Sequence, residues 1–432
     1  MPLRAIRVKG YFVVMRIARL ALSASGILCA GCWSGGDRNA QPADGGPTKP
    51  PLGSVMTCAG AEAPLPAIAD LPEVTALPDP FQSLGGSAIT TIDQWKTCRR
   101  AEIAAQAQVY ELGDKPDAPE SVTGSFADGT LTVTVTNAGK TISFPVTITP
   151  PTNGAQPPYP AMIGIGGIAI APAQLNALGV ATMNLPNDMI AEQKDGSSRG
   201  KGAFFTLYGS DHSAGAMIAW AWGVSRLIDA LEQTSSAQVD PARLGVTGCS
   251  RNGKGALIAG AFDERIVLTI PQESGSGGSA SWRISDAQQA AGMNVQTLSE
   301  INGENVWFRK SFSSFIGVTN KVPFDHHTIE GLVAPRALLV IENTDMEWLG
   351  NASTYNDSMA AHEIWSKLGI PDVMGLSQVG HPDHCVFPAS QQPEVTAYVQ
   401  KFLVGGGTAS TSILKTTGAY AYDKAKWAPW AP

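Results

Sequence analysis

Charge and long apolar runs are both scarce in this sequence of 432 residues. Charged residues make up 16% of the chain, and 37 acidic residues outnumber 30 basic ones, for a formal net charge of −7. Nucleic-acid-binding domains usually carry a basic face, so this class is excluded. No apolar run reaches the roughly 18 residues of a membrane-spanning helix. The hydrophobic fraction of 44% is enough for a sizeable core and excludes a disordered chain.

The N-terminus has the composition of an export signal. Residues 1–31 contain basic residues and no acid, and they include a short apolar stretch at 20–30. Translation from Met15 would give the basic region a more ordinary length. We expect a signal peptide over residues 1–31 and a secreted or extracytoplasmic protein.

Two interpretations of the cleavage site remain open. Ala30-Gly31-Cys32 is similar to the box at which bacterial lipoproteins are cleaved and acylated, although Cys29 stands where an aliphatic residue is usual. The protein is therefore either simply secreted or lipid-anchored at Cys32. A Pro/Gly-rich linker over 32–55 and a catalytic domain over 56–432 are expected to follow.

Four further cysteines fit an oxidising compartment. They are Cys58, Cys98, Cys249 and Cys385, and spacing alone cannot choose among their three pairings.

The pattern of the body predicts an α/β fold. Residues 121–149 alternate apolar and polar around a turn at 137–140, which predicts an antiparallel hairpin. After Pro150, short apolar runs alternate with helical stretches, of which the clearest is Ser213–Gln233 with a capping serine. Such alternation indicates a mostly parallel central sheet with helices on both faces.

A nucleophile is predicted at Gly248-Cys249-Ser250-Arg251-Asn252. A strand is expected to end at Thr247 and a helix to begin a few residues later, so Ser250 would lie on a sharp strand-to-helix turn. Asn252 replaces the usual second glycine, and asparagine tolerates left-handed geometry. The plain alternative is a Gly/Ser turn entering a helix.

A serine nucleophile needs a base. Among six histidines, His384 follows the predicted strand Val373–Val379, the position of the base in α/β-hydrolases. Cys385 follows His384 directly, as Cys249 directly precedes Ser250. A disulfide between these cysteines would hold the two loops together.

The orienting acid is open from chain order alone. Glu273 ends the strand after the nucleophile, whereas Asp345 and Glu347 lie just past the predicted strand Ala337–Glu342, nearer the usual acid position.

The segment Gly245–Ala256 resembles the signature of the glucuronoyl esterases, carbohydrate esterase family fifteen, and especially of their fungal members. The likeness runs from about Cys58 to Leu403. It continues in Leu77–Phe81, Cys98–Glu102, Tyr208–Met217, Trp220–Arg226, Pro271–Gly275, Trp282–Asp286 and Asp325–His327.

This resemblance implies an α/β-hydrolase that cleaves the ester between a lignin alcohol and the 4-O-methyl-glucuronic acid of glucuronoxylan. It places the nucleophile on Ser250, the base on His384 and the acid on Glu273, and it makes Arg251 a stabiliser of the oxyanion. It also implies a disulfide between Cys58 and Cys98. The residues expected to bind the sugar are Lys254, Gln296, Glu304 and Trp348.

Departures from the fungal pattern are limited. Ser281 and Ser358 stand where fungal relatives have a further cysteine pair. The histidine loop is one residue longer, which makes His381 a second candidate base.

Two other functions compete. The first is a carboxylesterase acting on acetyl or feruloyl groups of hemicellulose, and the second is a non-catalytic carbohydrate-binding protein. We expect no cofactor and no metal, because no Cys/His cluster has ligand spacing. The expected partner is the glucuronoxylan–lignin ester, and the protein is expected to be a monomer.

Overall fold

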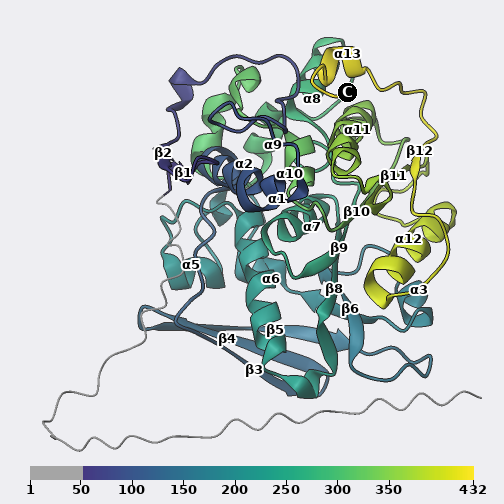
Figure 1. Ribbon diagram of the computed structural model, residues 1–432. Coiled ribbons are helices and arrows are strands. Elements are labelled where there is room, and N and C mark those ends of the chain that lie inside the picture. The colour runs from purple at the N-terminus through teal and green to yellow at the C-terminus, as the bar shows by residue number, and fades with distance from the viewer. Residues whose placement is uncertain (1–51) are drawn as a thin grey trace, which may run out of the picture. The chain divides into compact units, whose positions relative to one another are not determined.

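The computed structural model describes residues 52–432 (Figure 1). The predicted signal peptide and most of the predicted linker lie outside these residues. Strand β1 (Ser54–Met56) begins two residues before the predicted domain boundary and pairs with β2 (Glu62–Pro64) in a small antiparallel sheet. No helix of the described part of the chain is long and apolar enough to cross a membrane.

A ten-stranded, mostly parallel sheet forms the centre of the fold. Its order is β12-β11-β10-β9-β8-β6-β7-β5-β4-β3, with parallel pairing from β12 to β7 and antiparallel pairing from β7 to β3. This topology confirms the predicted α/β-hydrolase architecture. The strands are β3 (Ser121–Ala127), β4 (Thr130–Asn137), β5 (Lys140–Thr149), β6 (Tyr159–Ile165), β7 (Ala181–Leu185), β8 (Val239–Cys249), β9 (Ile266–Gln272), β10 (Ala337–Glu342), β11 (Met374–Gln378) and β12 (Leu414–Thr416).

The predicted hairpin is present at one edge of this sheet. Strands β4 and β5 pair from Thr130 to Asn137, and Asn137 stands opposite Lys140 at the turn. The alternating pattern buries Leu131, Val133 and Val135 on one face, because successive side chains of a strand point to opposite sides.

Helices cover both faces of the sheet. One apolar cluster holds side chains of α3 and α12 against β6, β9 and β10, and a larger one packs α6 and α7 on the other face (Figure 1). The helices are α1 (Ile92–Gln94), α2 (Arg100–Ala107), α3 (Pro172–Ala177), α4 (Asn187–Ile190), α5 (Ala203–Tyr208), α6 (Ala216–Glu232), α7 (Arg251–Phe262), α8 (Trp282–Ala290), α9 (Leu298–Glu304), α10 (His326–Gly331), α11 (Asn351–Lys367), α12 (Gln392–Tyr398) and α13 (Lys424–Trp427).

The prediction that a serine caps the helix after residue 213 is wrong. Helix α6 begins at Ala216, and the hydroxyl of Ser213 instead accepts a hydrogen bond from the Asp114 N–H. The first N–H groups of α6 donate to the carbonyls of Val306 and Trp307, at 2.9 and 3.2 Å. Carbonyl groups of a distant segment thus accept hydrogen bonds from the first N–H groups of α6. A side-chain cap would otherwise have this role.

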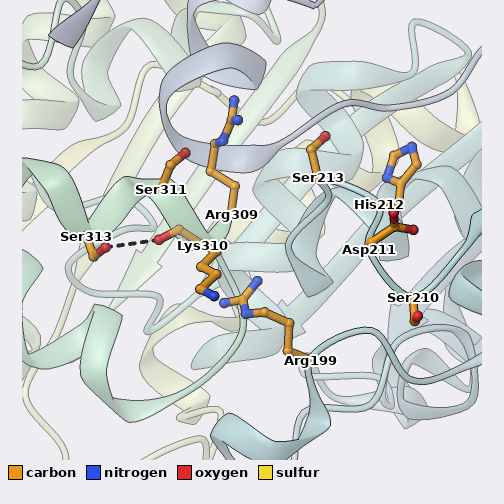
Figure 2. A pocket seen from close by; sticks show the side chains of 9 residues that line it. All are labelled: Arg199, Ser210, Asp211, His212, Ser213, Arg309, Lys310, Ser311 and Ser313. Carbon is orange, nitrogen blue, oxygen red and sulfur yellow. Dashed lines mark hydrogen bonds between the residues drawn. The ribbon is translucent and has the colours of Figure 1, made fainter.

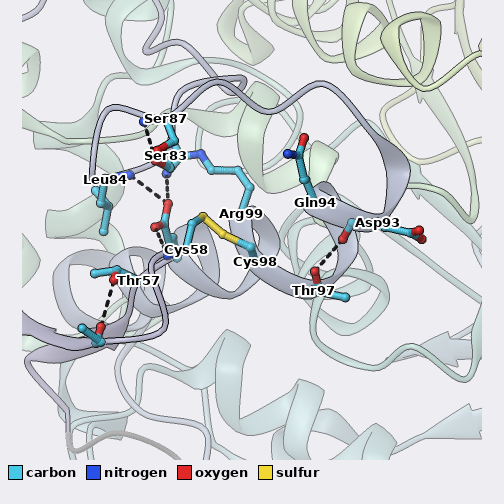
Figure 3. Close-up of a disulfide and its surroundings, with 12 residues drawn as sticks. Thr57, Cys58, Ser83, Leu84, Ser87, Asp93, Gln94, Thr97, Cys98 and Arg99 are labelled. Atoms are coloured by element: carbon cyan, nitrogen blue, oxygen red, sulfur yellow. Dashed lines mark hydrogen bonds and ion pairs between the residues drawn. A yellow bond between two sulfur atoms is a disulfide. The ribbon is translucent and has the colours of Figure 1, made fainter.

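A disulfide joins Cys58 to Cys98 near the start of the described chain (Figure 3). The buried carboxylate of Glu102 lies beside it and accepts hydrogen bonds from the N–H groups of Cys58 and Leu84 and from Arg99, all at about 3 Å. The disulfide fixes the turn between β1 and β2 to the helical segment before α2, and Glu102 of α2 adds hydrogen bonds to that turn and to Leu84.

Candidate active site

Ser250 lies between the end of β8 and the start of α7. Its backbone is left-handed, with φ 60° and ψ −129°, a strained conformation for a residue with a side chain. The turn is tight, because a Cβ at Gly248 would lie 2.3 Å from the carbonyl oxygen of Asn252. The Ser250 N–H donates to the carbonyl of Gln272 at 3.0 Å, so the turn is attached to the end of β9.

Asn252 does not have the role that the sequence suggested. It is helical, in the first turn of α7, and the left-handed residue is Ser250 itself. The side-chain oxygen of Asn252 accepts hydrogen bonds from Asn187 and Gln193, and its amide lies where a Cβ of Gly166 would be. Asn252 therefore connects the serine turn to the glycine-rich loop after β6.

His384 is oriented by Glu273. Its Nδ1 lies 2.7 Å from Glu273 Oε2, which also accepts the Cys385 N–H at 3.0 Å. The other ring nitrogen, Nε2, is buried and has no hydrogen-bond partner within the described chain. A histidine whose Nδ1–H is held by a carboxylate keeps Nε2 free to accept a proton.

A second disulfide joins the serine turn to the histidine loop. Cys249 and Cys385 are bonded, with their Cα atoms 5.7 Å apart. Ligand atoms of Cys249, Cys385 and His384 lie within 4.8 Å of one another, which places the imidazole next to the turn that carries Ser250. Because both sulfurs are in the disulfide, they are not thiolate ligands for a metal ion.

Glu273 stays ionised although it is buried. Burial alone would raise its pKa, but hydrogen bonds from His384, from the amide of Gln272 and from the Cys385 N–H outweigh it and hold the pKa below the ordinary value. Glu273 can therefore stabilise a positively charged imidazole.

The other candidate acids and bases take different positions. Asp345 is exposed, and its carboxylate lies over Gly380. Glu347 is also exposed. His381 is buried, with its Nε2 3.4 Å from the second oxygen of Glu273 and its Nδ1 3.2 Å from the amide of Asn343. Both histidines of this loop thus face the same carboxylate.

The remaining histidines have structural partners. His326 lies 3.2 Å from Glu111, and His327 and His362 contact the carbonyls of Pro78 and Pro371. His212 Nδ1 accepts the Ala214 N–H.

The expected sugar-binding residues surround the same site. The amide of Gln296 donates to Glu304 at 3.3 Å, and the backbone N–H of Gln296 donates to the carbonyl of Trp348 at 3.1 Å. The Trp348 ring is half-buried and packs edge-on against His384 at 4.8 Å. The Arg251 side chain is exposed and lies over the Trp307 ring at 5.8 Å.

Lys254 is buried and does not form a solvated face of α7. Its Nζ donates to the carbonyls of Ser274 and Ser276, in the loop that follows Glu273. Burial lowers the pKa of Lys254 to about 8, although the nearby carboxylates of Glu342 and Glu304 act to raise it.

Glu342, at the end of β10, was not recognised in the sequence. It is buried, one oxygen accepts the Gly275 N–H at 3.2 Å, and the other has no partner in the described chain. Burial raises its pKa to about 8, helped by the charge of Glu273. Glu342 ends the strand that usually precedes the acid of this fold, and this position could have identified it in the sequence.

Comparisons with known proteins identify the family. A model described as "Glucuronyl esterase, fungi" matches residues 133–369. The 4-O-methyl-glucuronoyl methylesterase of Hypocrea jecorina is 50% identical over 85% of this chain and 77% of its own length.

The chain belongs to the fungal glucuronoyl esterase family.

Solved structures of glucuronoyl esterases agree with this assignment. The catalytic domain from Hypocrea jecorina superposes with a TM-score of 0.80 at 50% identity, covering 85% of this chain and 99% of that one. A serine-to-alanine variant of the glucuronoyl esterase from Sporotrichum thermophile, in complex with methyl 4-O-methyl-beta-D-glucopyranuronate, gives a TM-score of 0.79 at 46% identity. That match covers 84% of this chain and 96% of the variant.

Proposed function

We propose that this protein is a secreted serine esterase that hydrolyses the ester between 4-O-methyl-D-glucuronic acid of glucuronoxylan and lignin alcohols. The observation that carries the proposal is the bond between His384 and Glu273 beside the Cys249–Cys385 disulfide, because it leaves His384 Nε2 unpartnered next to the Ser250 turn. The protein acts as a monomer, and Cys32 is the residue that a lipid anchor would use.

The reaction is a two-step acyl transfer. His384 Nε2 accepts the Ser250 proton as the serine oxygen attacks the ester carbonyl, and Glu273 stabilises the imidazolium. His384 then gives the proton to the departing lignin alcohol. In the second step His384 activates a water molecule, which hydrolyses the glucuronoyl-enzyme and releases the acid.

Negative charge develops on the carbonyl oxygen in both steps. The N-terminus of α7 directs backbone N–H groups to this region, and the Arg251 guanidinium adds a positive charge. The glycine-rich loop after β6 packs against the first turn of α7, where a Cβ at Gly166 would lie 2.4 Å from the side-chain amide of Asn252. A fixed donor at this place contributes roughly 3–4 kcal/mol of transition-state stabilisation.

The sugar is held by Gln296, Glu304, Lys254 and Trp348. Glu304 is exposed and can accept hydrogen bonds from sugar hydroxyls, while the indole offers an apolar surface to the pyranose ring. Two Lys254 N–H groups are used by backbone carbonyls, which leaves one for the substrate. Ser250 and His384 are only half-buried, which suits a substrate attached to two polymers.

Hydrolysis of benzyl glucuronate by the full chain and by Ser250→Ala tests this proposal. We expect turnover by the wild type and a loss of at least about 10⁴-fold in kcat in the variant, with unchanged thermal stability. Faster turnover of acetylated xylan or feruloyl esters would instead favour a general hemicellulose esterase. Xylan binding without turnover of any ester would make the protein a binding protein.

A further inference from the structure

A cavity of about 730 Å³ is lined by residues that do not belong to the candidate active site (Figure 2). Its volume is in the range of small-molecule sites. Its walls come from three separate segments of the chain: residue 199, the loop before α6 and the segment after Phe308. The lining residues are Arg199, Ser210, Asp211, His212, Ser213, Arg309, Lys310, Ser311 and Ser313.

The cavity is at the same end of the sheet as Ser250. The loop before α6 lies there because α6 leads from the carboxyl end of β7 back to the start of β8. Trp307, under Arg251, belongs to the segment that continues into Arg309 and Lys310. Trp307 and Asn252 also share a hydrogen-bond partner, Gln193. One extended polysaccharide can therefore reach both places.

Two cations of this cavity have no acidic partner. No ion pair involves Arg199 or Lys310 within residues 52–432, and in Figure 2 their charged groups point toward one another. Arg199 donates to the carbonyl of Phe308 at 3.0 Å, and burial lowers its pKa. The two positive charges repel each other, and an anion bound between them would relieve this repulsion. They stand out in a chain whose net charge is −7.

The rest of the lining is polar. Arg309 adds a third positive charge, but its guanidinium is used by the carbonyls of Gln108 and Val109. Among the described residues of the lining only Asp211 is acidic, and in Figure 2 it lies beside His212 and away from Arg199 and Lys310. Ser210 and Ser311 are exposed, and their hydroxyls make no hydrogen bond within the described chain. Hydroxyls around a cation pair suit a ligand with both a carboxylate and sugar hydroxyls.

We propose that Arg199 and Lys310 form a second subsite, which binds the free carboxylate of an unesterified uronic acid on the same xylan chain. This inference rests on the proposed function, since it assumes that the substrate is a glucuronoxylan. The guanidinium supplies two N–H donors in the geometry of a carboxylate, and the ammonium adds a point charge. The subsite would draw the esterase to xylan that carries several uronic acids.

Two matched substrates test the subsite. Both are xylo-oligosaccharides with one benzyl-esterified 4-O-methyl-glucuronic acid, and only one of them carries a second, free glucuronic acid. We expect the wild type to favour the doubly substituted ester by about fivefold in kcat/KM at low ionic strength. This preference should vanish near 1 M salt, where the Debye length is about 3 Å.

Lys310→Gln is the main variant, because the Lys310 side chain makes no hydrogen bond within the described chain. It should lose the preference, and so should the double variant Arg199→Gln/Lys310→Gln, whereas Lys310→Arg should keep it. Lys140→Gln, at the exposed turn between β4 and β5, is the control of equal charge and should retain the wild-type ratio. A wild type without preference, or a Lys310→Gln variant with the full preference, would overturn the inference.

If neither ester is hydrolysed, the proposed function is wrong. Isothermal titration calorimetry then tests whether the subsite binds a uronic acid. The unesterified oligosaccharide with glucuronic acid and its neutral counterpart are then titrated into the wild type and into Lys310→Gln. Charge-dependent binding that Lys310→Gln weakens supports the subsite, and equal binding by both proteins contradicts it.

Discussion

Within residues 52–432, Glu273 is the carboxylate partner of His384, although Asp345 and Glu347 lie at the usual acid position of the fold. Glu273 reaches it from the end of the neighbouring strand β9, and the same carboxylate accepts the Cys385 N–H. The acid therefore positions the backbone of the histidine loop as well as the imidazole.

Glu273→Gln should lower kcat by about 10³- to 10⁴-fold, because the amide cannot stabilise the imidazolium and can hold the wrong tautomer. Asp345→Asn should stay within about twofold of the wild type, since Asp345 is exposed and the carboxylate that bonds to His384 is that of Glu273. Steady-state kinetics on benzyl glucuronate, with melting temperatures as a control for folding, measure both. A large loss in Asp345→Asn would show that Asp345 shares the role of the acid.

The sequence alone predicts the site residues that belong to local motifs. Ser250 and His384 were found because each stands in a recognisable loop next to a cysteine. Glu273 was one of three acids until the family resemblance chose it. The buried state of Glu342 and Lys254 could not be found, because it depends on the packing of β10 and α7 against the loop after Glu273.

At the scale of elements, the strands were easier to predict than the helix ends. The apolar runs predicted at Ala337–Glu342 and Val373–Val379 match β10 and β11 to within one residue, since both faces of a covered sheet are buried. Strand β12 has no such run and was not predicted. Helix α6 started later than expected because its N-terminus is satisfied by the carbonyls of Val306 and Trp307, which are about 90 residues away in the sequence.

The two disulfides connect different pairs of elements and should have different effects. Replacing Cys249 and Cys385 by serine should lower the free energy of unfolding by about 3–5 kcal/mol and also lower kcat, because the serine turn and the histidine loop lose their link. Replacing Cys58 and Cys98 by serine should lower stability by a similar amount and leave kcat nearly unchanged. Denaturant unfolding and kinetics on the folded variants compare the pairs. Equal kcat values in both would show that the histidine loop keeps its position without the bond.

At the scale of the whole molecule, buried carboxyls connect stability to pH. Burial raises the pKa of Glu342 to about 8, and it also raises the pKa values of Glu330 and Asp357. A carboxyl with a raised pKa binds its proton more tightly in the folded state, so stability is lost as the pH rises from the unfolded value near 4.5 to about 8. Burial lowers the pKa of His327 to about 4, which has the opposite effect below about pH 6.5.

Glu342→Gln isolates one of these groups, because glutamine has the same shape and does not titrate. Between pH 6 and 7.5, the stability of the wild type relative to this variant should fall by about 2 kcal/mol. Denaturant unfolding of both proteins at each pH measures the difference, and contributions such as that of His327 cancel. Parallel stability curves would mean that Glu342 titrates normally.

The bond between Cys249 and Cys385 also makes the geometry of the site depend on the redox state of two thiols. The base loop and the serine turn lie 136 residues apart in sequence, and they are tied only when two thiols are oxidised. A newly made chain in a reducing cytosol keeps those thiols free. We therefore expect the reduced chain to hydrolyse esters more slowly than the oxidised one, which links activity to an oxidising compartment.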